Sequence, residues 1–365
     1  MKGSTTDQVS FPMTHRGYLE YADIPREFLK SLETSRVGVP AAHLFSTVGL
    51  ALLTPLLYRV FPSWVTWIVC VLLTIRVLNC FSQLVHASNH GDLFPDARLN
   101  RWAGNVCAYF LGFTRSGHAA SHHSHHVHLN THLDPDRAFL GVPDPRFESV
   151  SGMLRKILLD LAGVSAIRRL LQYQQPTARG FEPRPWRSLD RAFWVRAARM
   201  QLPVAAVQGL LLAYYWASVG PFLYLAIYIL PLFTLYTAQS RLRFFVEHSL
   251  EPGYTPPTPE DVWITRSTRA SWLERLLVAP LGMPFHFEHH LLPSVPYYHL
   301  RRLHEHLRQR NVHVPVADGY FRFLWNRLKL EVPAQGERSS APAASLTPDP
   351  RPCSREVGVG APEQP

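Results

Sequence analysis

The chain has 365 residues, with 37 lysines and arginines against 27 aspartates and glutamates, and a formal net charge of +10. The basic residues are mostly arginines scattered around long apolar runs, so an anionic membrane surface is favoured over nucleic acid as the partner of this excess charge. The four cysteines form no CxxC pair and are too sparse for a disulfide framework, which argues against a zinc knuckle, an iron–sulfur domain or a small secreted fold.

Along the chain, a polar segment precedes two pairs of apolar runs. Residues 1–40 are polar, and we expect them to form a cytosolic segment without a signal peptide. The apolar runs follow at 41–58 and 64–80, and again at 202–216 and 221–237. Within each pair the runs are joined by a short turn and carry aromatic residues at their ends, which is typical of membrane helices. We interpret them as four transmembrane helices in two hairpins.

The basic residues predict which side of the membrane each segment faces. The turns within the hairpins carry only Arg59, while Arg76 lies near the end of the second run, where it could reach the headgroups. By the positive-inside rule, both termini and the region between the hairpins face the cytoplasm, at what we expect to be a bacterial inner membrane. In that region, residues 106–113 are predicted to lie in the interface or re-enter. Residues 151–172 are predicted to form one amphipathic helix, either on the membrane surface or packed in the cytosolic part.

The remaining segments complete the predicted domain organisation. A membrane domain extends over residues 41–310 and is followed by a C-terminal cytosolic segment at 311–332. Residues 333–365 are rich in proline, alanine, serine and glycine, so we expect a disordered tail.

Nine of the nineteen histidines lie in three short clusters. His-Ala-Ser-Asn-His at 86–90 follows the second predicted span, His-His-Ser-His-His occupies 122–126, and His-Phe-Glu-His-His occupies 286–290. On a helix, positions i, i+3 and i+4 share a face, so HxxxH presents two imidazoles side by side and HxxHH presents three. An even number of predicted crossings separates the clusters, which places all three on the same side of the membrane.

The number and type of these ligands predict a pair of redox-active metal ions. Eight imidazoles exceed what one tetrahedral zinc requires, so two metals are indicated. Imidazole suits iron, zinc, copper and nickel, and the position at the ends of membrane helices, within reach of an apolar substrate, favours iron. Taken alone, each cluster has an ordinary alternative: a solvated helix face, an adventitious metal-binding tract, or a zinc or surface motif. Together they predict an all-α integral membrane protein with a cytosolic helical cap that carries a histidine-rich di-iron site.

These clusters resemble the signature of the membrane fatty acid desaturase family, which is HxxxH, HxxHH and HxxHH around two membrane hairpins. The strongest match is LERLLVAPLGMPFHFEHHLLPSVPYYHL at 273–300, where Leu-Leu-Pro and Val-Pro follow the histidines. The other matches extend from His122 to Asp134-Pro-Asp and from His86 through Gly-Asp-Leu-Phe. The resemblance covers roughly residues 40–310.

The resemblance implies nine iron ligands: His86, His90, His122, His125, His126, His248, His286, His289 and His290. His248 is included because members of the family often have a further ligand at the cytoplasmic end of the fourth membrane helix, although an interfacial histidine is the alternative. A second register, in which His118, His122 and His123 bind, also remains open.

Carboxylates close to the clusters are candidates to orient the ligands. Metal-bound imidazoles usually donate their other N–H to a carboxylate or a carbonyl. We expect this role first for Asp134 and Glu247, and then for Glu288, Asp92 and Asp136, with simple surface solvation as the alternative for each.

The resemblance also implies an activity. It predicts an O2-dependent di-iron lipid desaturase that introduces a double bond into a fatty acyl chain, with no catalytic side chain beyond the metal ligands. The sequence contains no haem motif and no cysteine-rich module, so the electrons are expected to come from a separate carrier such as a ferredoxin or a cytochrome b-type protein. A hydroxylase or carotenoid-type oxygenase with the same ligands is an alternative, and a membrane metal-binding or transport protein is an alternative of another class.

Overall fold

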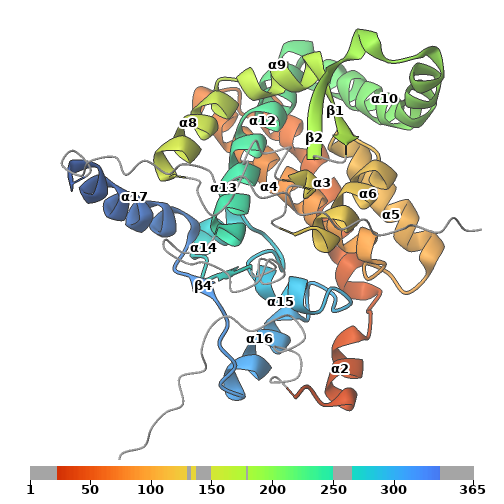
Figure 1. Ribbon diagram of the computed structural model, residues 1–365. Coiled ribbons are helices and arrows are strands. Elements are labelled where there is room, and N and C mark those ends of the chain that lie inside the picture. Colours follow the sequence, from red (N-terminus) through yellow and green to blue (C-terminus); the bar gives the residue numbers. More distant parts are fainter. Residues whose placement is uncertain (1–22, 130–132, 137–148, 178–179, 250–264, 338–365) are drawn as a thin grey trace, which may run out of the picture.

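The computed structural model describes residues 23–129, 133–136, 149–177, 180–249 and 265–337. The chain is mostly helical (Figure 1). Its α-helices, in chain order, are α2 (Arg26–Glu33), α3 (Gly38–Val60), α4 (Trp64–His90), α5 (Ala97–Phe110), α6 (Arg115–Val127), α8 (Val150–Leu161), α9 (Val164–Leu171), α10 (Arg191–Val219), α11 (Pro221–Tyr224), α12 (Leu230–Phe233), α13 (Leu235–His248), α14 (Trp272–Leu277), α15 (His286–Leu291), α16 (Leu300–Gln309) and α17 (Tyr320–Glu337).

Short strands add a small β component that the all-α prediction did not include. Strands β1 (Gln172–Thr177) and β2 (Gly180–Pro185) pair antiparallel, and β3 (Ser267–Thr268) pairs parallel with β4 (Val316–Ala317). The second pair joins segments that are far apart in the chain, which no local pattern could have predicted.

Among the described residues, four stretches are long and apolar enough to cross a membrane. They are Arg26–Val60, which contains α2 and α3, then α4, α10, and the stretch from Pro221 to His248. The last of these is not one regular helix, because a π-helical segment at Leu225–Ile229 and a break at Thr234 separate α11, α12 and α13. Each stretch extends beyond the corresponding predicted span.

Helix α4 carries the first histidine cluster on its own last turn. Its start is capped by the Ser63 side chain, which accepts a hydrogen bond from the Thr66 backbone N–H at 3.1 Å. Its end comes at His90, where Gly91 adopts φ of 80°, a left-handed conformation that favours glycine. The predicted span ended earlier, where the side chains become polar, but the helical backbone continues past that point. The cluster therefore belongs to this helix and does not follow it.

The greater length of α4 also corrects the placement of Arg76. This residue lies in the middle of the helix, not near its end, and its guanidinium donates to the carbonyls of Arg275 and Leu276 at 3.1 and 3.2 Å. These carbonyls belong to the last turn of α14, where they have no partner within the helix. A nearby cation stabilises such carbonyls. Arg76 thus fixes α14 against α4.

Helix α5 packs closely against the histidine-bearing end of α4. A Cβ atom placed on Gly104 would lie 2.0 Å from the Ser88 hydroxyl oxygen, so only glycine allows this approach. The Asn100 side chain donates to the Ser88 carbonyl at 2.8 Å and accepts from the backbone N–H groups of Leu93 and Phe94. The segment predicted to lie in the interface, residues 106–113, is the end of α5 and the turn after it.

The region between the second and third long helices also differs from expectation. Residues 151–172 form two helices, because Gly163 adopts φ of 74° between α8 and α9 and ends the first. Helix α8 packs against α13, where Arg241 makes two hydrogen bonds to the buried carboxylate of Asp160, at 2.5 and 2.9 Å. Helix α17 extends to Glu337, into the segment predicted to be disordered, and residues 338–365 lie outside the described part of the chain.

Candidate metal centre

Four helices bring the nine predicted ligands together. His86 and His90 lie on the last turn of α4, and His248 is the last residue of α13. The other two clusters lie on α6 and α15. These helices come from separate parts of the chain and lie beside one another in the central part of the molecule (Figure 1). Thr114 caps the start of α6 by accepting a hydrogen bond from the Gly117 N–H.

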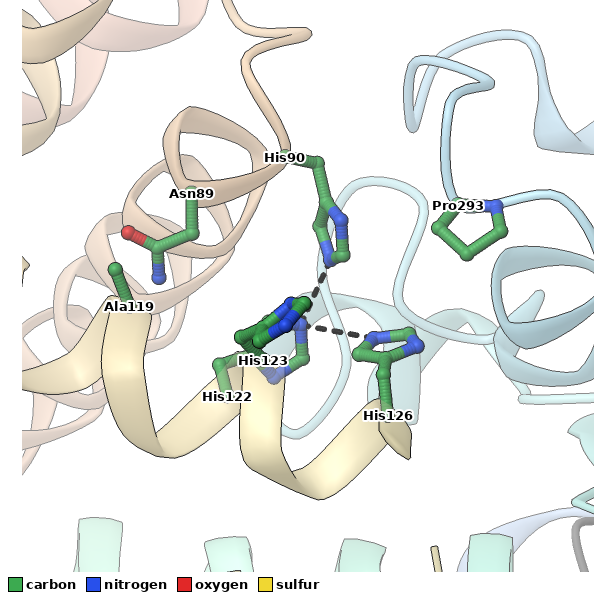
Figure 2. A pocket seen from close by; sticks show the side chains of 7 residues that line it. All are labelled: Asn89, His90, Ala119, His122, His123, His126 and Pro293. Atoms are coloured by element: carbon green, nitrogen blue, oxygen red, sulfur yellow. Dashed lines mark hydrogen bonds between the residues drawn. The ribbon is translucent and has the colours of Figure 1, made fainter. Parts of the chain in front are cut away.

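Five of these histidines form a first group. One ring nitrogen of each lies within 4.8 Å of those of the others, and the members are His86, His90, His122, His126 and His289. The Nε2 atom of His122 lies 2.7 Å from that of His90 and 3.0 Å from that of His126 (Figure 2). The His126 Nε2 atom lies 3.2 Å from the His289 Nε2 atom. The nitrogen atoms therefore converge on a common centre.

The remaining four histidines lie beside this group. His125, His248 and His290 form a second set within 4.8 Å, and His286 forms a further set with His248 and Glu247. The Nε2 atoms of His248 and His286 are 2.8 Å apart. We call His125, His248, His286 and His290 the second group. It contacts the first group through the stacked rings of His126 and His290, whose centroids are 4.3 Å apart.

Helical spacing explains how each HxxHH sequence serves both groups. On α6 the i and i+4 residues, His122 and His126, face the first group, while His125 between them faces the second. On α15 the arrangement is reversed, because His289 faces the first group and the pair His286 and His290 lies with the second. The two helices thus divide their six imidazoles between two adjacent centres.

The protonation state of the histidine rings and an unpaired ring nitrogen are both consistent with metal binding. Burial, together with nearby His90, lowers the pKa of His126 to about 2. Burial and neighbouring imidazoles also hold the pKa values of His289 and His290 well below the usual range, so these rings are neutral at pH 7 and keep a lone pair for a metal. The Nε2 atom of His290 is buried and has no hydrogen-bond partner among the described residues. Such an atom costs about 1–3 kcal/mol when unmatched, and a bound metal removes that cost.

The two histidines of the competing register lie outside both groups. His123 is exposed, because it is rotated away from the face shared by His122 and His126. His118 stacks on Phe113, with ring centroids 5.3 Å apart, and its Nδ1 atom lies 2.6 Å from the Asn89 amide nitrogen. This geometry favours the register that begins at His122.

Three of the predicted carboxylates, on Asp134, Asp136 and Glu247, lie beside cluster histidines. The Nδ1–H of His125 donates to the fully buried Asp134 at 2.9 Å, and the Asp136 carboxylate lies 3.7 Å from the same nitrogen. Burial lowers the pKa of His125, but Asp136 and Asp134 outweigh it, so the pKa is raised. The carboxylate of Glu247 lies 3.7 Å from His286 Nδ1 and accepts a hydrogen bond from the Tyr320 hydroxyl at 2.8 Å.

The other two carboxylates, on Glu288 and Asp92, have different partners. Glu288 lies between His286 and His289 in sequence, yet its carboxylate accepts from the Ser267 hydroxyl and lies 2.5 Å from His304 Nδ1. Asp92 is buried, its Oδ1 atom has no partner among the described residues, and no contact joins it to a cluster histidine. On a short helix, a residue two positions from a ligand faces the opposite way, which explains the orientation of Glu288.

Sequence reasoning missed three side chains that support the clusters: Ser267, His304 and Tyr320. Ser267 hydrogen-bonds both the Glu288 side chain and the Phe287 backbone N–H, and so anchors α15. His304, on α16, contacts the same Glu288 carboxylate. Tyr320, at the start of α17, donates a hydrogen bond to the Glu247 carboxylate. All three lie outside the histidine clusters in sequence. The only available signal was the general rule that ligating groups need partners.

A small cavity opens on the first group. It has a volume of about 180 Å³ and is lined by Asn89, His90, Ala119, His122, His123, His126 and Pro293 (Figure 2). Three of the lining residues, His90, His122 and His126, also belong to the five-histidine group. Part of this group therefore borders an open cavity.

We expect Asp134→Asn to lower the affinity for iron by about 10–100-fold, because the amide no longer provides the carboxylate that orients His125. Iron bound per protein, measured against a series of chelator concentrations, tests this expectation. Asp136→Asn is the matched control, since its carboxylate is farther from His125 and partly exposed. An equal affinity in the two variants would contradict the role of Asp134.

Comparison with known proteins places this geometry in context. A protein-family model described as fatty acid desaturase matches residues 62–318, which is most of the chain. The chain is also 22% identical, over 334 residues, to a protein of Synechocystis sp. named sn-1 acyl-lipid omega-3 desaturase (ferredoxin). That alignment covers 87% of this chain and 88% of the relative. Both matches include the four helices that carry the nine predicted ligands, which are α4, α6, α13 and α15.

Proposed function

The chain belongs to the fatty acid desaturase family, and from that premise we propose that it is an O2-dependent, membrane-embedded lipid desaturase that introduces a double bond into a fatty acyl chain. The observation that carries this proposal is the convergence of nine buried or half-buried histidines, from four helices, into two adjacent groups. The name of the Synechocystis relative supports an acyl chain attached to a lipid as the substrate.

We assign one iron ion to each histidine group. His86, His90, His122, His126 and His289 would hold the first ion, and His125, His248, His286 and His290 the second. The donor set is all imidazole, which suits iron. When bound, the iron pair supplies the activation of O2 that removal of hydrogen from an unactivated chain requires.

The protein's own groups position the ligands and keep out water. Asp134 accepts the Nδ1–H of His125 and so directs the other ring nitrogen towards the second group. Glu247, held by Tyr320, supports His286 in the same way from the other side. Burial keeps most of the rings neutral and limits side reactions with solvent. Two electrons from a separate carrier and two protons balance the reaction, so that O2 and the two hydrogens of the chain leave as water.

The membrane orientation is part of the proposal. The turn between α3 and α4 and the turn at Gly220 lie at the opposite ends of the long helices from His90 and His248. Apart from Arg59 and the mid-helix Arg76, the basic residues lie towards the histidine-bearing ends, which supports a cytoplasmic metal site and cytoplasmic termini.

Lipid profiling of a bacterial host that expresses the protein tests the function directly. We expect new acyl chains about two mass units lighter than their precursors, formed only in the presence of O2. Products about sixteen mass units heavier would identify a hydroxylase instead. The His289→Ala variant is the control, and an unchanged lipid profile with iron-loaded wild-type protein and a reducing partner would refute the proposal.

A further inference from the structure

Helix α16 presents an arginine-rich outer face next to the metal-binding helix α15. Its sequence LRRLHEHLRQ buries Leu300, Leu303 and Leu307 against the core. The opposite face exposes Arg301, Arg302 and Arg308, which we call the α16 face. Because these charges belong to a well-packed helix, they form a fixed surface feature.

Neighbouring groups leave this face with a small excess of positive charge. Glu305 is the one carboxylate on α16, and it pairs with Arg301 at 2.9 Å. Arg302 lies over the ring of Phe28 on α2, with its guanidinium carbon 5.7 Å from the ring centroid. Around α16, Lys30 and Arg310 add positive charge, while the acidic residues nearby are Asp23, Glu27 and Glu33. Arg308 is exposed and forms no ion pair with another residue in the described part of the chain.

One contact joins α16 to the histidine groups. His304 lies on the same helix as the three arginines, and its Nδ1 atom is 2.5 Å from the carboxylate of Glu288. Glu288 stands on α15 between His286 and His289. A protein bound to the α16 face therefore lies close to the metal-binding helix, which a donor of electrons requires.

The composition of the face indicates a protein partner, not lipid. No large apolar side chain is exposed on α2 or α16, both of which are fully described. By contrast, α14 exposes Trp272 at 76% together with Leu273 and Leu276, and α17 exposes Trp325 at 58%. A helix that lies in a lipid interface needs such apolar groups beside its basic residues. The α16 face lacks them, and Figure 1 shows α16 and α2 together at the end of the molecule away from α8 and α9.

We propose that the α16 face docks an acidic one-electron carrier protein of the ferredoxin class. The inference rests on the proposed function, because that reaction takes its electrons from a separate carrier. Charge complementarity of this kind steers association and weakens with salt, since the screening length is about 10 Å at 0.1 M ionic strength.

Binding of an acidic plant-type ferredoxin to the iron-loaded protein in phosphatidylcholine nanodiscs tests the proposal. We expect Arg301→Gln/Arg308→Gln to weaken binding about tenfold and to reduce its salt dependence. The matched control is Arg98→Gln/Arg101→Gln, which removes two exposed arginines from α5 and should leave the affinity unchanged. Hydrogen exchange of residues 300–309 should slow when ferredoxin is added.

The outcomes separate this inference from the function itself. Equal affinity of wild type and the α16 variant, or a loss confined to the α5 variant, overturns the docking site. The same holds if exchange of residues 300–309 slows in phosphatidylglycerol nanodiscs but not with ferredoxin, because the face then contacts lipid. Desaturation that persists without any ferredoxin binding at α16 refutes the docking proposal alone, whereas binding without desaturation refutes the function alone.

Discussion

Replacing His125 with alanine is expected to abolish activity and to lower the bound iron, while the protein still inserts into membranes. His125 belongs to the second histidine group, is buried, and is held by Asp134. Because loss of a group that only orients a ligand already costs about 10–100-fold, loss of the ligand itself should cost at least about 100-fold in activity. Iron content and lipid product analysis of the purified variant measure both effects.

His123→Ala is the matched control for this experiment. His123 lies on the same helix and in the same run of histidines, yet it is exposed and belongs to neither group. We expect it to keep its iron and most of its activity. If His123→Ala lost iron and His125→Ala kept it, the competing register would be correct and the present ligand assignment wrong.

The second large effect is expected from Arg241→Met. The Arg241 guanidinium makes two hydrogen bonds to Asp160, and the exposed fractions of the two side chains are 5% and 0%. Removal of the arginine leaves a buried carboxylate without its partner, which costs about 3–5 kcal/mol of folding stability. The unfolding temperature in detergent, followed by tryptophan fluorescence, should fall clearly below that of the wild type.

A double variant distinguishes loss of this ion pair from a general packing defect. Arg241→Met/Asp160→Leu replaces both charges with apolar groups, and such replacements are often neutral or stabilising in buried sites. We therefore expect the double variant to recover most of the stability that the single variant loses. A double variant as unstable as the single one would mean that the pair fixes α8 to α13 by shape, not by charge.

Local sequence patterns predicted the long helices and the gathering of histidines at their ends. Apolar runs marked the four long helices, and the i, i+3, i+4 spacing of the histidines predicted that each cluster shares a helix face. The limits of the elements were less predictable. Helix α4 continues through polar residues to His90 because its backbone hydrogen bonds do not depend on side-chain hydropathy, and Gly163 divides a pattern that looked continuous.

What the sequence determined by itself was which side chains are available to bind a metal and how they are spaced along each helix. Only the tertiary structure decided that His125 faces one group while His122 and His126 face the other, that Glu288 turns towards His304, and that Tyr320 supports Glu247. The physical reason is that periodicity fixes directions around a single helix axis, whereas these contacts depend on how four separate helices are rotated and packed against one another.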